Sequence, residues 1–445
     1  MNTSNISEKI SGELLDFIAA SPSCYHAAEN IAQALRTHGW QELSEAKAWE
    51  LCPGGRYYVR RNVGTVIAFT VPRGELKGFQ IGAAHCDSPT FRIKENMEIF
   101  VDGAYTELNV EKYGGMLCAP WFDRPLSVAG RLAVRTEDGV ESRLVNVDRD
   151  LMLLPSLAIH MDRSLNDGHK YSIQNDMRPL LGDERSKGQF MRIVADAAGV
   201  EEEDILGSDL FLYCRGRGTV WGASNEYLSA PKLDDLQCAY ALLQGFLASA
   251  PADGAANVCA IFNNEEVGSK TRQGAASTVL QDTLRRIIES LGGTYQDYLR
   301  VLASSYFVSA DNAHAAHPNH LSAADPTNHP HMNGGIVIKF SGYMRYTTDA
   351  VSAALFRSFC ERAGVPTQTF HNHSDSRGGG TLGNISAAQV SVNSVDIGLP
   401  QLAMHSAVET AGVMDTGYLI EAMKQVYSSR VEDDGRGGYR VIADE

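Results

Sequence analysis

The chain has 445 residues, a formal net charge of -15, and 44% hydrophobic and 21% charged residues. This length exceeds one ordinary core and predicts about two to three domains, or one large enzyme domain with an insertion. The acidic charge argues against nucleic acids and anionic membranes as partners, because both bind basic surfaces. No apolar run is long enough to span a bilayer, and the N-terminus shows no secretory signal. The eight cysteines are scattered, which favours reduced thiols, so we expect a cytoplasmic protein.

The predicted elements change in character along the chain. Two helices are predicted first, separated by a break at residues 21–23, and the second ends near Gly39. The apolar strands RYYVRR, TVIAFTVP and GFQIGAAH follow. From about residue 91 to 228, short alternating strands between Gly and Asp turns predict a β-rich module with one helix near residues 189–198. After residue 230, helices alternate again with apolar strands, which is typical of a largely parallel sheet.

This pattern predicts an α/β fold with a central, mostly parallel sheet flanked by helices and interrupted by a β-rich inserted domain. The expected boundaries are 1–90 for the first part of the α/β domain, 91–228 for the inserted domain and 229–445 for the second part of the α/β domain.

Several predicted strands end in residues that bind metals. The stretch ANVCAIFNNEEVGSK places Glu265 and Glu266 after an apolar strand, where an acidic pair is ordinarily only solvated. Comparable side chains stand at four other such positions: His85 with Asp87, Asp234, Asp311 and His405. Each has an ordinary explanation when taken singly, such as a core histidine or a helix cap. Because open α/β sheets bind ligands at the carboxyl ends of their strands, the set together predicts a metal site.

The types of these residues indicate the metal chemistry. Imidazoles and carboxylates without thiolates suit zinc, manganese or cobalt. Two imidazoles and three carboxylates exceed the needs of one tetrahedral ion, whereas two ions that share a carboxylate would use all of them. Such a pair activates a water and polarises the group that the water attacks. One member of the Glu pair would then bind metal and its neighbour transfer a proton, while Asp87 would hold the second imidazole nitrogen of His85.

Five stretches carry a specific resemblance, in this order along the chain: AAHCDSP, SAPKLDDL, NNEEVGS, SADNAHAAHPN and PQLAMHSAVET. With them the chain resembles the aspartyl aminopeptidase family, which also includes a yeast vacuolar aminopeptidase. The resemblance implies a zinc aminopeptidase with two zinc ions per subunit, an inserted domain for dimerisation and assembly, and a homo-oligomer that is a dodecamer. Matched position by position, the implied metal ligands are His85, Asp234, Glu266, Asp311 and His405. Asp234 would be the bridge, Glu265 the general base and Asp87 the orienting acid.

The resemblance also implies two substrate-binding residues. A histidine of the inserted domain reaches the neighbouring subunit's active site in the family, which implies His160, because Ser156 stands where another histidine is expected. A lysine in a strand like GGIVIKFSGYMRY binds the acidic substrate side chain, which implies Lys339; the alternative is a surface lysine on an edge strand. Asp235 departs from the expected asparagine and could tighten metal binding or disfavour an acidic substrate.

We therefore predict a metallo-aminopeptidase that removes the N-terminal residue, preferably Asp or Glu, from peptides. One alternative uses the same two-metal chemistry as an aminopeptidase of neutral specificity or an amide deacylase. An alternative of another class is a non-catalytic assembly protein on the same fold, although a scaffold has no need of a base such as Glu265. The Gly-rich stretch SRGGGTLGN lacks the ending of a phosphate loop, and we expect it to form a wall of the active site.

Overall fold

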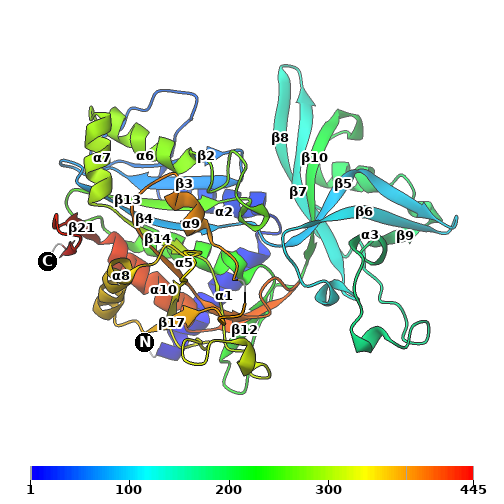
Figure 1. The fold of residues 1–445 in the computed structure, drawn as a ribbon. Coiled ribbons are helices and arrows are strands. Elements are labelled where there is room, and N and C mark those ends of the chain that lie inside the picture. Colours follow the sequence, from blue (N-terminus) through cyan, green and yellow to red (C-terminus); the bar gives the residue numbers. More distant parts are fainter. Residues whose placement is uncertain (1–2, 377, 444–445) are drawn as a thin grey trace.

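A nine-stranded sheet forms the centre of the larger lobe in the computed structural model, which describes residues 3–376 and 378–443 (Figure 1). The strand order is β1 (Gln41–Glu42), β2 (Arg56–Arg61), β3 (Thr65–Thr70), β13 (Ala255–Phe262), β4 (Gly78–His85), β14 (Tyr306–Ala310), β18 (Asn393–Gly398), β16 (Ile336–Phe340) and β17 (Thr367–His371). The central strands β13, β4, β14 and β18 are parallel to their neighbours in this group. The prediction of a mostly parallel central sheet is therefore confirmed.

Helices cover both faces of this sheet, because its central strands are apolar on both sides. In β4, Ala84 packs into the core on one face, whereas Phe79 and Ile81 pack into the core on the other. The first face is covered by α1 (Thr3–Ala19), α2 (Cys24–Thr37), α5 (Leu233–Ala248), α8 (Ala350–Ala363) and α10 (Asp415–Tyr427). The second is covered by α6 (Val279–Ser290), α7 (Tyr295–Ala303) and α9 (Leu382–Ala387).

The second lobe is a six-stranded antiparallel sheet with a core of its own (Figure 1). Its order is β8 (Gly139–Asn146), β7 (Leu126–Thr136), β10 (Ile205–Cys214), β5 (Thr90–Val101), β6 (Tyr105–Tyr113) and β9 (Leu180–Asp183). Helices α3 (Ile173–Asp176) and α4 (Phe190–Ala198) belong to the same segment of the chain. The β-rich insertion thus consists of strands that lie between Thr90 and Cys214.

A smaller sheet joins the end of the insertion to the C-terminal half. It contains β11 (Thr219–Trp221), β12 (Tyr227–Ala230), β20 (Glu409–Gly412), β19 (Pro400–Leu402) and β15 (Ala313–His314). The predicted inserted domain ends at residue 228, yet β11 pairs with β12, which pairs with β20 and not with the six-stranded sheet. The division into domains stays a proposal, and Cys214 is the structural end of the inserted sheet.

The remaining secondary structure lies at the C-terminus, where β21 (Ser429–Asp433) and β22 (Tyr439–Ala443) form a two-stranded ribbon. Within the described chain, no helix is long and apolar enough to cross a membrane. The eight cysteines are not paired in disulfides in this structure, and six of them are buried.

Candidate metal centre and active site

Three neighbouring parallel strands bring their carboxyl ends to one edge of the central sheet. His85 is the last residue of β4, and Asp311 follows β14 directly. Glu265 and Glu266 lie in the short 3-10 turn η5 (Glu265–Val267), which follows β13 after two asparagines. Because β13, β4 and β14 are adjacent in the sheet, side chains far apart in sequence meet at this edge.

The other two predicted ligands come from outside these strand ends. Asp234 stands at the start of α5 but has an extended backbone, with φ of -82° and ψ of 106°, so it is not an ordinary helical residue. His405 follows β19, which belongs to the small five-stranded sheet and not to the central sheet as we expected. Its backbone is left-handed, with φ of 65°. Long-range strand pairing, which the sequence does not display, decides this placement.

The five predicted ligands form two groups that share one carboxylate. Asp234 Oδ1 lies 3.5 Å from His85 Nε2, and its other oxygen, Oδ2, lies 3.3 Å from His405 Nε2. Ligand atoms of His85, Asp234 and Asp311 lie within 4.8 Å of one another, and so do those of Asp234, Glu266 and His405. The two oxygens of Asp234 thus face two different imidazoles, as a bridging carboxylate requires.

The donor set fits metal ions. His85 and Asp234 are 1% and 3% exposed, and Asp234 Oδ1 and Glu266 Oε1 have no hydrogen-bond partner among the described residues. Buried carboxylate oxygens are costly without a cation or a donor, and carboxylate with imidazole is a donor set for zinc. Burial opposes ionisation of Asp234, but the neighbouring imidazoles of His405 and His85 lower its pKa. Burial and the neighbouring Asp234 raise the pKa of Glu266 well above its usual value.

Asp87 contacts both His85 and the turn that carries Glu265 and Glu266. Its main-chain carbonyl lies 3.0 Å from His85 Nδ1, whereas its carboxylate is 3.5 Å away. The carboxylate accepts hydrogen bonds from the backbone N–H groups of Glu265 and Glu266, at 3.1 and 3.2 Å. Asp87 therefore contacts the histidine mainly through its backbone, and its side chain fixes the turn that carries both glutamates.

Glu265 has the environment of a proton-transfer group. Its side chain is close enough to those of His85 and Glu266 that their ligand atoms lie within 4.8 Å. Burial, together with the charges of Asp311, Asp87 and Asp234, raises the pKa of Glu265 to about 8, although His85 opposes the shift. A carboxylate with a raised pKa is better suited to take up a proton near neutral pH.

Glu409 is a part of the site that the sequence analysis missed. It begins β20 and is 1% exposed. One of its oxygens accepts the backbone N–H of Asp234 at 2.9 Å, and the other accepts the backbone N–H of His405 at 2.6 Å. A single carboxylate thus fixes the backbones of two predicted ligands. In the sequence, its only signal is its position in the motif PQLAMHSAVET, between Val408 and Thr410.

A cavity of about 330 Å³ opens beside the predicted ligands and also contains Lys339. Lys339 is 3% exposed, and its ammonium group donates to Asp311 Oδ1 at 3.3 Å and to the Asn312 carbonyl at 2.8 Å. It lies on β16, between β18 and β17, so the alternative of a surface lysine on an edge strand is wrong. Gly379 and Gly380 line the same cavity, as expected of the Gly-rich stretch.

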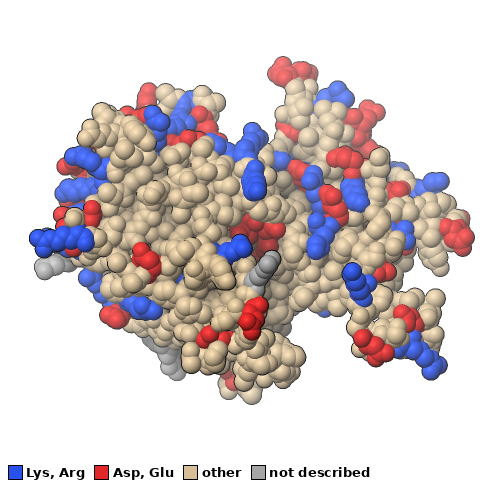
Figure 2. Space-filling model, viewed as in Figure 1, with Lys and Arg blue, Asp and Glu red and all other residues tan. Residues whose placement is uncertain are grey.

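Asp235 and His160 lie away from this cavity. Asp235 is fully buried and its carboxylate accepts the backbone N–H of His85 at 3.2 Å. Burial raises the pKa of Asp235 well above its usual value, and Asp235 is not among the described residues that line the cavity. His160 is exposed in the inserted lobe and is not among the described residues that line the cavity. Figure 2 shows acidic side chains recessed in the hollow between the two lobes.

An α/β sheet with two overlapping His–carboxylate groups at its carboxyl edge, and a glutamate beside them, defines a metal-dependent hydrolase. The family model described as "Aminopeptidase I zinc metalloprotease (M18)" matches residues 17–427. The "Probable M18 family aminopeptidase 2" of Clostridium acetobutylicum is 44% identical over 424 residues, which cover 94% of this chain and 98% of that protein. The protein of the same description from Pseudomonas aeruginosa PAO1 is 38% identical over 425 residues, covering 94% and 97%.

Solved structures agree with this assignment. The structure of Ape4 in complex with Nbr1 is similar with a TM-score of 0.91 and 33% identity, covering 95% of this chain and 86% of that chain. The dodecameric mApe1 of S. cerevisiae is similar with a TM-score of 0.82 and 28% identity, covering 95% and 96%. The chain belongs to the M18 family of zinc metalloproteases, and it is an aminopeptidase.

Proposed function

We propose that this aminopeptidase removes N-terminal Asp or Glu residues from peptides. Each subunit would use two metal ions for this reaction, and the ions would be zinc, or manganese or cobalt in its place. The observation that carries the proposal is the pair of ligand groups that share Asp234. His85, Asp234 and Asp311 would hold one ion, and Asp234, Glu266 and His405 the other. Bound metal would polarise the peptide carbonyl and lower the pKa of the attacking water.

The side chains of this chain supply the remaining chemistry. The Glu265 carboxylate accepts a proton from the water and returns it to the departing amine. The Asp87 carboxylate keeps Glu265 in place through its backbone N–H. An acidic substrate side chain would be repelled by the surrounding carboxylates unless it met a cation, and Lys339 is the cation that lines the same cavity.

The assembly and location are part of the same proposal. A similar protein was solved as a dodecamer, which supports a homo-oligomer of that size here. His160 stands exposed in the inserted lobe, where it could reach the active site of a neighbouring subunit. The free thiols are in keeping with a cytoplasmic enzyme.

A substrate panel tests the proposal. Metal-free protein would be reloaded with zinc, manganese or cobalt, and turnover measured on Asp, Glu, Leu and Ala anilides and on N-acetyl amino acids. We expect two ions per chain, activity on free amino termini and a preference for Asp and Glu. Preference for Leu would indicate neutral specificity, activity on N-acetyl substrates would indicate a deacylase, and metal binding without any turnover would indicate an assembly protein.

A further inference from the structure

The segment of residues 113–117 begins with the last residue of β6 in the inserted sheet and contacts the candidate active site of its own chain. Tyr113 is the last residue of β6, and the next residues lead away from the inserted sheet towards the larger lobe. Contacts with the glutamate turn and with His405 both come from this short segment. The inserted lobe therefore reaches the active site within one chain, separately from any role of His160 between chains.

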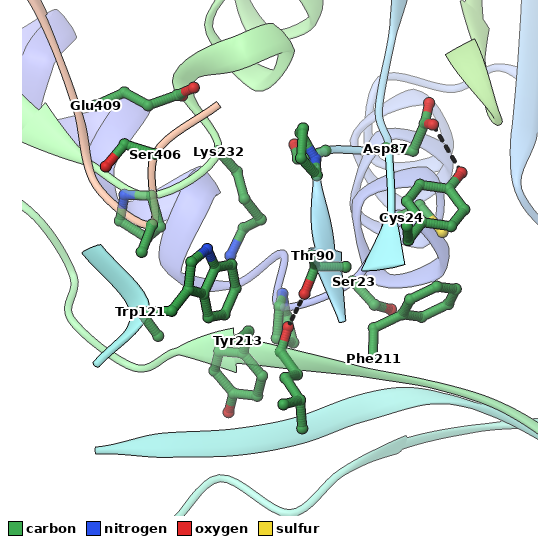
Figure 3. Close-up of a pocket in the computed structure, with 18 of the residues that line it drawn as sticks. Ser23, Cys24, Asp87, Thr90, Trp121, Phe211, Tyr213, Lys232, Ser406 and Glu409 are labelled. Carbon is green, nitrogen blue, oxygen red and sulfur yellow. Dashed lines mark hydrogen bonds between the residues drawn. The ribbon is translucent and has the colours of Figure 1, made fainter. Parts of the chain in front are cut away.

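Tyr113 joins two residues that hold the glutamate turn. Its hydroxyl donates to Asp87 Oδ2 at 2.7 Å, which is the bond marked at Asp87 in Figure 3, and it accepts from Asn264 Nδ2 at 2.8 Å. Asp87 in turn accepts the backbone N–H groups of Glu265 and Glu266. Asn264 directly precedes these glutamates and has a left-handed backbone, with φ of 65°. One hydroxyl group thus links both sides of the turn.

The residues after Tyr113 contact the other ligand group through their backbones. Gly114 has φ of 79°, and a Cβ at this position would lie 3.2 Å from both the Cβ and the carbonyl oxygen of Glu266. A Cβ at Gly115 would lie 3.9 Å from His405 Nδ1, and Leu117 N–H donates to the His405 carbonyl at 3.0 Å. A side chain at residue 114 would be in tight contact with Glu266 and would need a strained backbone, so both space and conformation favour glycine.

We propose that Tyr113 is a positioning residue, which holds the turn of Glu265 and Glu266 through Asp87 and Asn264, so that the inserted lobe completes the active site of its own chain. The inference rests on the proposed function and deepens it. Without the hydroxyl, Asp87 Oδ2 loses its O–H donor, and the Asn264 amide loses its acceptor. The turn then has more freedom, and both the base and a metal ligand are less well oriented.

Tyr25 provides a matched control. Its ring packs against Phe211 with centroids 6.4 Å apart, and the ring of Tyr113 packs against the same Phe211 at 5.3 Å. The hydroxyl of Tyr25 donates to Asp209 at 3.2 Å, away from the metal ligands. Tyr25→Phe and Tyr113→Phe each remove one hydroxyl from a tyrosine on the same aromatic neighbour. They differ in whether that hydroxyl is linked to the glutamate turn.

The test measures kcat, KM, zinc affinity by competition with a chelator, and thermal stability. For Tyr113→Phe we expect kcat and zinc affinity about ten- to a hundredfold lower, as for other residues that orient metal ligands, with KM changed about twofold or less. Tyr25→Phe should keep kcat, KM and zinc affinity close to the wild-type values, and its melting temperature should be similar to that of Tyr113→Phe. If the two variants have equal kcat and equal zinc affinity, the positioning role is wrong.

A double-mutant cycle and an independent variant extend the test. Asn264→Gly keeps the left-handed backbone and removes the amide, whose oxygen also accepts from Thr271 and Gln273. Its loss should therefore exceed and include that of Tyr113→Phe, and the double variant should lie within about threefold of Asn264→Gly. If the losses of kcat and zinc affinity in the two single variants simply added in the double variant, Tyr113 and Asn264 would not act on the glutamate turn through the same hydrogen bond. Gly114→Ala should also weaken zinc binding, and unchanged affinity there would count against the segment as a support.

The outcome also separates this inference from the proposed function. If wild-type enzyme turns over acidic substrates and Glu265→Gln does not, while Tyr113→Phe behaves like Tyr25→Phe, the proposed function stands and the inference falls. If zinc-loaded wild type hydrolyses no peptide, the proposed function falls. Zinc affinity of the two tyrosine variants then decides the inference without reference to turnover.

Discussion

Lys339→Met tests the proposed basis of substrate specificity. A lysine ammonium group has three N–H donors. Asp311 Oδ1 and the Asn312 carbonyl accept two of them, which leaves one donor without a hydrogen-bond acceptor among the described residues, although the ammonium group also lies 5.6 Å from the centre of the Tyr346 ring. We expect this donor to bind the side-chain carboxylate of an acidic substrate. Methionine keeps most of the apolar stem and removes the charge.

The expected effect follows from the lost hydrogen bond. A hydrogen bond to a charged group contributes about 1.5–3 kcal/mol, which corresponds to about a 10- to 150-fold loss in kcat/KM for an Asp substrate. A Leu substrate has no side-chain carboxylate, so its kcat/KM should fall only by the loss of activity that the variant shows on every substrate. Such a general loss is expected, because Asp311 loses its ion-pair partner in the same variant. The ratio of the Asp and Leu constants removes this shared loss.

The assay compares kcat/KM for Asp, Glu and Leu anilides in wild type and variant, at equal metal content. The Asp-to-Leu ratio should fall at least about tenfold. An unchanged ratio with lower overall activity would mean that Lys339 serves only as the counter-ion of Asp311. A wild-type enzyme that prefers Leu would refute acidic specificity itself.

Three further predictions concern stability, assembly and metal. Glu409→Gln should lower the free energy of unfolding by about 2–4 kcal/mol relative to the exposed control Glu8→Gln. The reason is that the amide oxygen of glutamine can accept only one of the two backbone N–H groups that Glu409 accepts. Equal denaturation midpoints for the two variants would contradict this prediction. Mixed oligomers of His160→Ala and Glu265→Gln subunits should regain activity that neither parent has, and no gain would exclude action across a subunit boundary. Burial among carboxylates raises the pKa of Glu265 from 4.5 to about 8, so metal-free protein should lose stability as the pH rises over that range. Zinc should therefore raise the melting temperature more at pH 8 than at pH 5.5, and an equal rise would contradict the account.

The central sheet and three of its strand ends could be predicted because the signal is local. Strands β4, β13 and β14 are buried on both faces, so each reads as a short, mostly apolar run. Open α/β sheets bind their ligands at the carboxyl ends of the strands, which predicts a site at His85, Glu265, Glu266 and Asp311. Both steps use only the residues of each strand and those that follow it.

Other features depend on contacts that no local pattern shows. The sequence predicts His405 at a strand end of the central sheet, but β19 pairs with β20 and β15 in a separate sheet. The burial of Lys339 depends on β17 lying outside β16, and strand order is not written in the apolar pattern. Tyr113 and Asn264 form a hydrogen bond although they are 151 residues apart in the sequence, and Glu409 and Asp234 form one although they are 175 residues apart. Roles of this kind become visible only when the hydrogen-bond partners are known.

Glu265→Gln provides the most direct test of the central claim, that a metal centre built around Asp234 works with Glu265 as its base. Metal content and kcat on an Asp substrate would be measured on the same zinc-loaded preparation. Glutamine keeps the size and polarity of the side chain but cannot take up the proton, so we predict two ions per chain and a kcat about a hundredfold or more below wild type. Near-normal turnover in the fully loaded variant would contradict the account.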